Sequence, residues 1–301
     1  MRKIKFYQID SFTDEVFGGN PTAVFLQAEE LADSEMKKIA REMNLSESAF
    51  MLPSTKADFK LRFFTPPGDE IKFCGHATIG ALCTISCEGL FGAKAGTVRD
   101  LKVETNAGIL AMTVDMTDLK NPAYSFAAPK IDMAIPEYSL SEVISALGIP
   151  SSHVNMNMPL MIERTNNYLF FAVPSLKHLG ELNVNFQAAS QYASRDKIVV
   201  FCAITNEAFD KNHQIHCRGY APFVGVPEDP FTGSMMGGVC GYIVKNQLVP
   251  QSAINIVVEQ GHFIGRPGKV EMEISRGSEL KARLTARAMP VFKSEITLSN
   301  T

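Results

Sequence analysis

Two stretches of small residues, 73–82 and 229–238, constrain the fold of this chain more than any other part of its sequence. Each joins a polar turn to a run rich in Gly, Ala and Met, which we expect to form a buried helix. At a helix start the first backbone N–H groups have no partner within the helix and carry the positive end of its dipole, so an anion can bind there. Two such helix starts predict a two-sided site for a small carboxylic acid.

The two halves of the chain repeat the same order of features around these stretches. In each half a strand with aromatic residues comes before the small-residue stretch and a strand ending in Val-Glu comes after it: 61–66 and 103–104 in the first half, 216–222 and 258–259 in the second. The turn glycine and this glutamate are 29 residues apart in the first half and 26 in the second. This gapped match predicts two similarly folded lobes whose helix starts face one cleft.

Hydrophobic periodicity and breaker residues predict an α+β protein. The first lobe is expected over 1–118 and the second over 119–278, because the pattern loosens around 116–138; the segment 279–301 is expected to return to the first lobe. Strands are predicted at 3–10, 22–26, 49–52, 59–64, 101–105, 109–115, 168–173, 198–203, 214–220, 254–259, 269–274 and 279–286, and helices at 31–43, 77–87, from Ser139 to Gly148, at 186–194 and after Gly233.

Composition excludes several classes of protein. A net charge of −3 with no block of Lys or Arg argues against a nucleic-acid or anionic-membrane surface. The N-terminus lacks the apolar segment of a signal peptide, and no run reaches the roughly 18 apolar residues of a membrane span. Six cysteines at irregular spacings indicate reduced thiols in a cytoplasmic protein.

A few polar residues near the two stretches are candidates for chemistry. Glu47, between two serines in a turn before an apolar strand, is the best candidate proton carrier, although a surface glutamate would look the same. His76 either acts on a substrate or caps its own helix. Asp229 is either a second acid, base or orienting group, or an ordinary turn aspartate before a proline. Gly233 and Ser234 offer N–H groups and a hydroxyl to an anion, or simply cap a helix.

A metal site and a phosphate loop are weaker interpretations. Cys74, His76, Cys83 and Cys87 are potential zinc ligands, but there is no CxxC pair, so we expect small buried thiols and no bound metal. Residues 232–238 lack the spacing and the lysine of a phosphate loop. Neither motif therefore supports a bound metal ion or phosphate group.

Five motifs follow one another along nearly the whole chain: 8–24, 46–50, 74–78, 228–234 and 265–268. In this order they resemble the PhzF family, phenazine biosynthesis-like isomerases with the diaminopimelate epimerase fold. The resemblance implies two lobes related by a pseudo-twofold, each a curled mixed β-sheet around a central helix, with the active site between them. It also implies a homodimer.

The same resemblance implies cofactor-independent isomerase chemistry on a small carboxylic acid. Glu47 would move a proton between two carbons, assisted by His76 and Asp229. The residues implied to bind the substrate are Asn20, Gly75, Gly233, Ser234 and Arg266.

Two alternatives stay open beside this isomerase. Related epimerases and proline racemases use a cysteine at each helix start; Cys74 stands at the first, but Thr232 stands near the second, which disfavours a two-thiol racemase. The other alternative is a non-catalytic protein that binds small molecules. Phe231 and the pair 235–236 place bulk where the family often has small residues, which predicts a narrower site.

Overall fold

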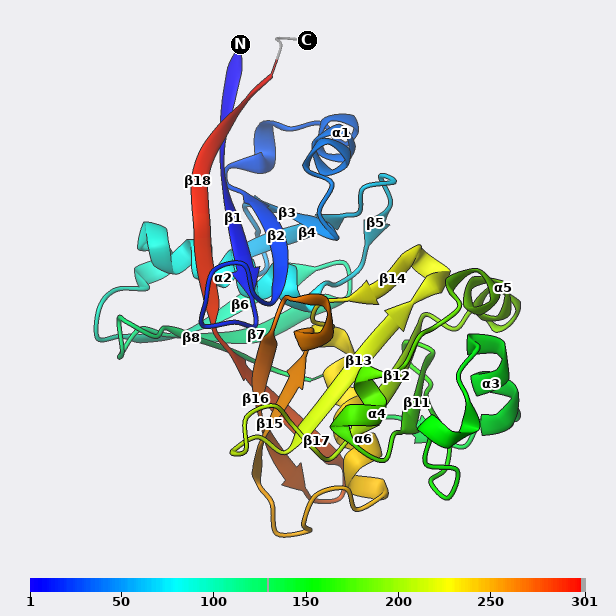
Figure 1. Cartoon of the computed structure of the whole chain (residues 1–301). Coiled ribbons are helices and arrows are strands. Elements are labelled where there is room, and N and C mark those ends of the chain that lie inside the picture. The colour runs from blue at the N-terminus through cyan, green and yellow to red at the C-terminus, as the bar shows by residue number, and fades with distance from the viewer. Residues whose placement is uncertain (129, 299–301) are drawn as a thin grey trace. The chain divides into compact units, whose positions relative to one another are not determined.

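The computed structural model describes residues 1–128 and 130–298, which form two compact units (Figure 1). Unit 1 consists of residues 1–127 and the C-terminal residues from 285, and unit 2 of residues 128–284. The lobes expected from the sequence change over at 118/119 and 278/279, near these limits. Pro129 and the last three residues of the segment 279–301 lie outside the described residues.

Unit 1 is a mixed sheet with two helices. Its elements are β1 (Arg2–Ser11), β2 (Asn20–Phe25), α1 (Asp33–Met43), β3 (Glu47–Leu52), β4 (Phe59–Phe64), β5 (Glu70–Ile71), α2 (Gly75–Glu88), β6 (Val98–Thr105), β7 (Gly108–Asp115), β8 (Ala123–Ala127) and β18 (Ala288–Leu298). The pairs β2–β3 and β4–β6 are parallel, and the pairs β1–β2, β3–β4, β4–β5, β6–β7, β7–β8 and β1–β18 are antiparallel.

Unit 2 repeats this arrangement. Its elements are β9 (Met133–Ala134), α3 (Leu140–Leu147), β10 (Met161–Glu163), β11 (Tyr168–Ala172), α4 (Leu176–Gly180), α5 (Phe186–Asp196), β12 (Val200–Thr205), β13 (Ile215–Ala221), β14 (Val226–Asp229), α6 (Met236–Lys245), β15 (Asn255–Gln260), β16 (Gly268–Arg276) and β17 (Leu280–Ala286). The pairs β11–β12 and β13–β15 are parallel, and the pairs β10–β11, β12–β13, β13–β14 and β15–β16 are antiparallel. The series β10 to β16 therefore matches the series β1 to β7, so the predicted internal repeat is confirmed.

The small residues of α2 and α6 allow each helix to lie directly on its own sheet. A Cβ at Gly80 would lie 2.4 Å from Thr22 Cγ2 on β2, and a Cβ at Gly238 would lie 2.2 Å from Phe170 Cζ on β11. These glycines lie five residues after Gly75 and Gly233, respectively. In each unit a glycine at the same place thus lets the central helix approach the equivalent strand.

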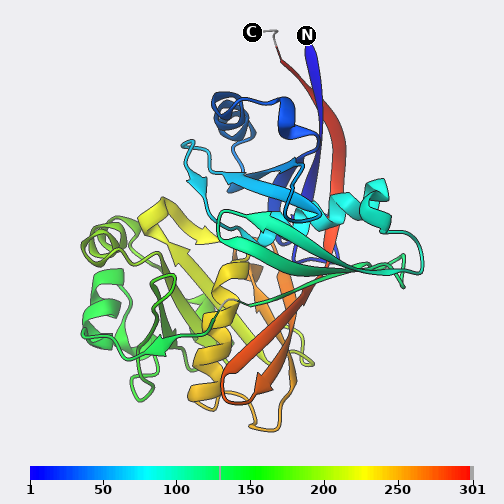
Figure 2. The same cartoon turned by 180° about the vertical axis from the view of Figure 1, so that it is seen from behind.

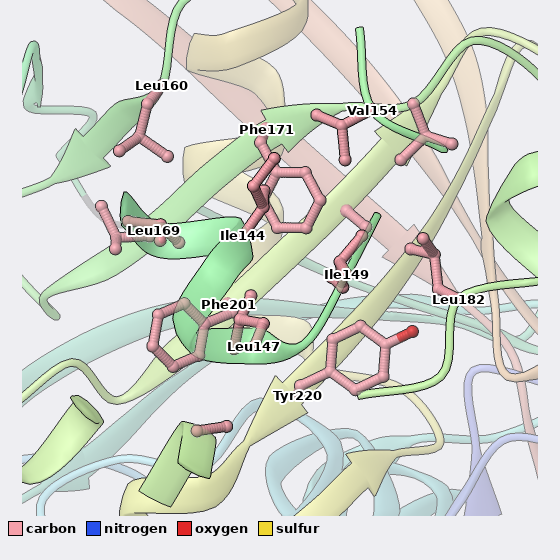
Figure 3. Close-up of a cluster of buried hydrophobic side chains, with 14 of the residues drawn as sticks. Ile144, Leu147, Ile149, Val154, Leu160, Leu169, Phe171, Leu182, Phe201 and Tyr220 are labelled. Carbon is pink, nitrogen blue, oxygen red and sulfur yellow. The ribbon is translucent and has the colours of Figure 1, made fainter. Parts of the chain in front are cut away.

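The two faces of the sheet in unit 2 carry different layers. Figure 3 shows one layer, in which Leu147 of α3 and Phe171, Phe201 and Tyr220 of three neighbouring strands pack together. Phe170 points to the opposite face, where α6 lies, and Figure 2 shows this helix from the other side. Strands β11, β12 and β13 are therefore buried from both sides.

Several local predictions need correction. Glu47 does not lie in a turn: it is the first residue of β3, because β3 pairs with β2 from this position onward. The helix predicted at 31–43 begins two residues later, at Asp33, because Ala32 is its N-cap. Residues 233–235 form a 3-10 turn before α6 begins, and the C-terminal segment contains a separate strand, β18, that the sequence pattern did not indicate.

The predicted stops at Asn44 and Gly148 are confirmed, since both residues end their helices in the left-handed conformation. The predicted hairpin of β6 and β7 is confirmed as well. Within the described residues, no helix has both the length and the apolar character that crossing a membrane requires.

Candidate active site

The backbone of Glu47 is held by the parallel pairing of β2 and β3. Glu47 is in register with Thr22, whose hydroxyl donates to the Glu47 carbonyl oxygen at 2.9 Å. Residues in register share a face of a sheet, and Thr22 faces Gly80 of α2, so the Glu47 side chain lies on the face that carries α2. Asn20 is fully buried and lies two residues before Thr22 on the same strand.

His76 is the second residue of α2 and meets Glu47. Its Nε2 lies 3.2 Å from Oε2 of Glu47, and its carbonyl oxygen accepts a hydrogen bond from Ser11 Oγ at 2.8 Å. The His76 side chain is 7% exposed and that of Glu47 19%. Burial lowers the pKa of His76 to about 3. The imidazole is therefore neutral at neutral pH and carries a single N–H proton.

Cys74 completes a group of three side chains that we call the Glu47 cluster: Glu47, Cys74 and His76. Cys74 is the N-cap of α2, its carbonyl oxygen accepts from the Thr78 hydroxyl at 2.7 Å, and its Sγ lies 3.4 Å from Nδ1 of His76. One potential ligand atom from each member lies within 4.8 Å of the others. Zinc can be bound by a carboxylate, a thiolate and an imidazole together. An activity test that involves the Glu47 cluster therefore includes a sample from which metal has been removed.

The other two cysteines considered as zinc ligands lie elsewhere on α2. Cys83 is buried and its Sγ lies 3.7 Å from the Ala288 carbonyl oxygen, whereas Cys87 is exposed. Neither belongs to the Glu47 cluster. The four-residue zinc set considered from the sequence is therefore not assembled.

In unit 2 a buried glutamine organises the turn after Asp229. The Asp229 carboxylate accepts from the Thr232 hydroxyl at 2.5 Å. The Gln260 side chain donates to the Asp229 carbonyl oxygen at 2.8 Å and accepts from the Thr232 backbone N–H at 3.1 Å. Gln260 is fully buried at the end of β15. The sequence analysis missed Gln260; a polar residue directly after the repeated Val-Glu pair is the only signal it offers.

Gly233 and Ser234 lie in the 3-10 turn that leads into α6. The Ser234 hydroxyl lies 3.0 Å from the Tyr168 hydroxyl, which makes Tyr168 a second residue that the sequence analysis missed. The bulky residues expected to narrow the site are all fully buried: Phe231, Met235 and Met236.

Arg266 lies in the loop between β15 and β16, and its backbone runs close to the turn after Asp229. The connection is Gly261, whose φ is +88°: a Cβ there would lie 2.3 Å from the Arg266 carbonyl oxygen and 2.5 Å from that of Pro230. A glycine is required because an L side chain at this φ would be strained and would meet both carbonyl groups. The Arg266 side chain is half-buried.

The predicted site residues thus fall into two groups. The structure brings Glu47 and His76 into contact within unit 1. Gly75 is on the helix that carries His76, and Asn20 is on β2, the strand paired with the one that carries Glu47. The second group belongs to unit 2 and consists of Asp229, Gly233, Ser234 and Arg266.

Comparison with known proteins gives consistent matches. The family described as phenazine biosynthesis-like protein, PhzC-PhzF, matches residues 9–294. An uncharacterized isomerase of Clostridium acetobutylicum is 34% identical over 99% of this chain and 100% of its own length. The trans-2,3-dihydro-3-hydroxyanthranilate isomerase of Pseudomonas aeruginosa is 29% identical over 88% of each chain. A crystal structure of a PhzF-family protein of Bacillus anthracis superposes with a TM-score of 0.89 at 25% identity, covering 99% of this chain and 100% of the other.

Proposed function

Because this chain belongs to the PhzC-PhzF family of phenazine biosynthesis-like proteins, and its curated relatives include isomerases, we propose that it is a cofactor-independent isomerase that moves a proton between two carbons of a small carboxylic acid. The contact between Glu47 and His76 carries this proposal. It places a partly exposed carboxylate against a buried, neutral imidazole. Such a carboxylate can take a proton from a substrate and give it back.

The reaction needs one proton and no external electrons. The Glu47 carboxylate removes a proton from a carbon near the substrate carboxyl group, and the electron pair of the broken C–H bond moves into the adjacent conjugated system. The protonated Glu47 then returns the proton to another carbon of that system, which shifts the double bond. Neutral His76 lies with Nε2 3.2 Å from Oε2 of Glu47 and with Nδ1 facing the Cys74 thiol, so it adds no positive charge that would hold Glu47 in the carboxylate form.

The substrate carboxylate is proposed to bind at helix starts. The first N–H groups of α2, at Gly75 and His76, carry the positive end of the helix dipole. We propose that the same substrate also contacts Asn20 and four residues of unit 2: Asp229, Gly233, Ser234 and Arg266. Donors aimed at the developing negative charge stabilise the transition state more than the ground state.

The substrate class follows from the proposed chemistry and from a relative's activity. A proton shift of this kind requires an acid with a C–H bond next to a double bond or carbonyl group. The Pseudomonas relative acts on trans-2,3-dihydro-3-hydroxyanthranilate, so cyclic unsaturated amino acids are the first compounds to test here. A homodimer in the cytoplasm is proposed from the family resemblance, and size-exclusion chromatography with light scattering tests the assembly.

Deuterium exchange tests the role of Glu47. Candidate acids are incubated in D₂O with wild type, Glu47→Gln and Glu47→Asp, and deuterium uptake is followed by mass spectrometry. We expect uptake with wild type, a loss of about two to four powers of ten with Glu47→Gln and partial activity with Glu47→Asp. Equal uptake by wild type and Glu47→Gln removes Glu47 from the mechanism. Parallel samples with a chelator show whether a metal in the Glu47 cluster takes part.

An amino-acid epimerase is the second candidate, because the Cys74 thiol lies 3.4 Å from His76. It predicts that Cys74→Ser is inactive, whereas the isomerase proposal predicts a mild effect. A non-catalytic binder predicts no exchange with any acid, together with ligand-induced melting shifts that Glu47→Gln leaves unchanged.

A further inference from the structure

Three histidines surround one glutamate in unit 2, and the proposed isomerase chemistry uses none of them. Glu259, the penultimate residue of β15, is in register with His216 on the parallel strand β13. His213 lies just before β13, and His262 begins the turn after β15. The side chains of Glu259 and His216 are 1% and 0% exposed.

Hydrogen bonds hold the Glu259 carboxylate in one orientation. Its Oε1 accepts from His213 Nδ1 at 2.7 Å and from the Asp210 backbone N–H at 3.0 Å. Its Oε2 accepts from His216 Nδ1 at 2.9 Å and from the Phe209 backbone N–H at 2.8 Å. The Glu259 carboxylate is thus buried and fixed in orientation by four donors.

The imidazoles around Glu259 have bonding capacity that the protein does not use. Within residues 1–128 and 130–298, neither His216 Nε2 nor His262 Nδ1 has a hydrogen-bond partner, although both atoms are buried. His262 Nε2 lies 3.9 Å from Glu259 Oε2, which is too long for a hydrogen bond. The Phe209 ring stacks on His262 with centroids 4.5 Å apart. Buried nitrogens without partners beside aromatic rings are costly unless they bind something else.

In unit 1 the equivalent glutamate, Glu104, has a lysine as its partner instead of a histidine. Glu104 is in register with Lys60 on the equivalent pair of strands, as Glu259 is with His216. The Lys60 ammonium lies 3.6 Å from the Glu104 carboxylate and supplies a permanent positive charge. In unit 2 the residue at the place of Lys60 is His216, whose side chain can bind a metal ion.

We propose that His216, Glu259 and His262 bind a divalent transition-metal ion of the zinc class. One ligand atom from each residue lies within 4.8 Å of the others. Ligands at ~2.1 Å from a tetrahedral zinc ion are ~3.4 Å apart, so the side chains must move closer together. The His216 Nδ1–H must also leave Glu259 Oε2, which frees an oxygen lone pair and an imidazole nitrogen for the ion. Imidazole nitrogens with one carboxylate suit zinc better than calcium or magnesium. His213 and the two backbone N–H groups orient the carboxylate from outside the site.

An ion at this site would join three segments of unit 2: the start of β13, the end of β15 and the turn that begins at His262. That turn leads to Arg266, and Gln260, next to Glu259, holds the turn after Asp229. The ion would therefore hold in place the parts of unit 2 proposed to bind substrate. The metal proposal does not depend on the isomerase proposal, because metal binding is measured without a substrate.

Metal binding is measured on the full-length protein after removal of metal by a chelator. Equilibrium dialysis against Zn²⁺, with zinc quantified by mass spectrometry, is run on wild type, His262→Gln, His213→Gln and the control His153→Gln. We expect zinc binding and a raised melting temperature in wild type and in the control. His213→Gln should weaken binding about 10- to 100-fold, as loss of a supporting residue does, and His262→Gln should weaken it more.

Cobalt substitution separates this site from the Glu47 cluster. Co²⁺ bound by nitrogen and oxygen ligands gives visible bands without the strong near-ultraviolet thiolate band, and Cys74→Ser should leave this spectrum unchanged. Circular dichroism confirms that His262→Gln, whose side chain is half-buried, remains folded. Absence of zinc binding in wild type, unchanged binding in His262→Gln, or loss of all cobalt binding in Cys74→Ser would overturn the proposal.

Discussion

The Nε2 atom of His76 lies 3.2 Å from Oε2 of Glu47, although 29 positions separate the two residues in the chain. The contact joins the first residue of a strand to the first turn of the central helix of unit 1. The carboxylate keeps partial access to solvent while the imidazole behind it is buried. This combination suits a proton carrier whose partner stays neutral.

The free energy of unfolding should decrease as the pH falls below 6.5, because the buried His76 resists protonation. Burial lowers its folded-state pKa to about 3 from 6.5, so below pH 6.5 the unfolded chain binds a proton that the folded chain does not. The contribution of neutral His76 to the free energy of unfolding is complete above pH 6.5. It decreases by up to about 1.4 kcal/mol for each pH unit below 6.5. Urea unfolding at pH 7, 6 and 5 should therefore show a shallower decline in His76→Gln than in wild type. The control His153→Gln should keep the wild-type slope; parallel curves for wild type and His76→Gln would contradict the assignment.

Gly80→Ala and Gly238→Ala should both destabilise the protein. Each new methyl group would press on the strand beneath the helix, at 2.4 Å from Thr22 or 2.2 Å from Phe170. Overpacking of this kind costs roughly 1–3 kcal/mol. The matched control is the exposed Gly277, because the nearest atom to a Cβ there lies 3.9 Å away. Thermal unfolding of the three variants checks the prediction, which fails if all three melt alike.

Gln260→Leu should loosen the turn after Asp229. The leucine retains the volume but leaves the Thr232 N–H and the Asp229 carbonyl group without their partner. Buried groups left unpaired cost about 1–3 kcal/mol each. Chemical unfolding should show this loss, and substrate binding should weaken with it. The same change at the exposed Gln251 should have little effect; an equally stable Gln260→Leu would show that the turn does not need the amide.

Glu228→Gln should strongly destabilise unit 2. Arg218 donates from Nε and Nη2 to the two Glu228 oxygens at 2.9 and 2.6 Å, and both side chains are 10% exposed. Removing the anion leaves a buried guanidinium without its countercharge, which costs about 3–5 kcal/mol.

The exposed pair of Arg164 and Asp132 is the control for this prediction. Its side chains are 61% and 38% exposed, so Asp132→Asn should cost no more than about 1 kcal/mol. The test compares the free energies of unfolding of Glu228→Gln, of Asp132→Asn and of the double variant Arg218→Met/Glu228→Met. We expect the double variant to recover part of the loss, and equal losses at both pairs would refute the role of burial.

The sequence by itself determined the internal repeat, most strands and helices, and the motifs that resemble the family. These features are local: alternating residues make strands, Gly148 ends a helix in the left-handed conformation, and small residues mark the central helices. Candidate site residues such as Glu47, His76 and Asp229 were recognised because polar residues interrupt such patterns. Their contacts did not follow from the pattern.

Only the tertiary structure decided which of these residues meet. Glu47 reaches His76 because β3 pairs in parallel with β2 and Gly80 brings α2 onto the same face. The contacts of Gln260 and of the histidines around Glu259 had no local signal, because their partners come from strands and loops distant in the chain. Register and close packing place such side chains within hydrogen-bonding distance, and both depend on the whole sheet rather than on any single segment.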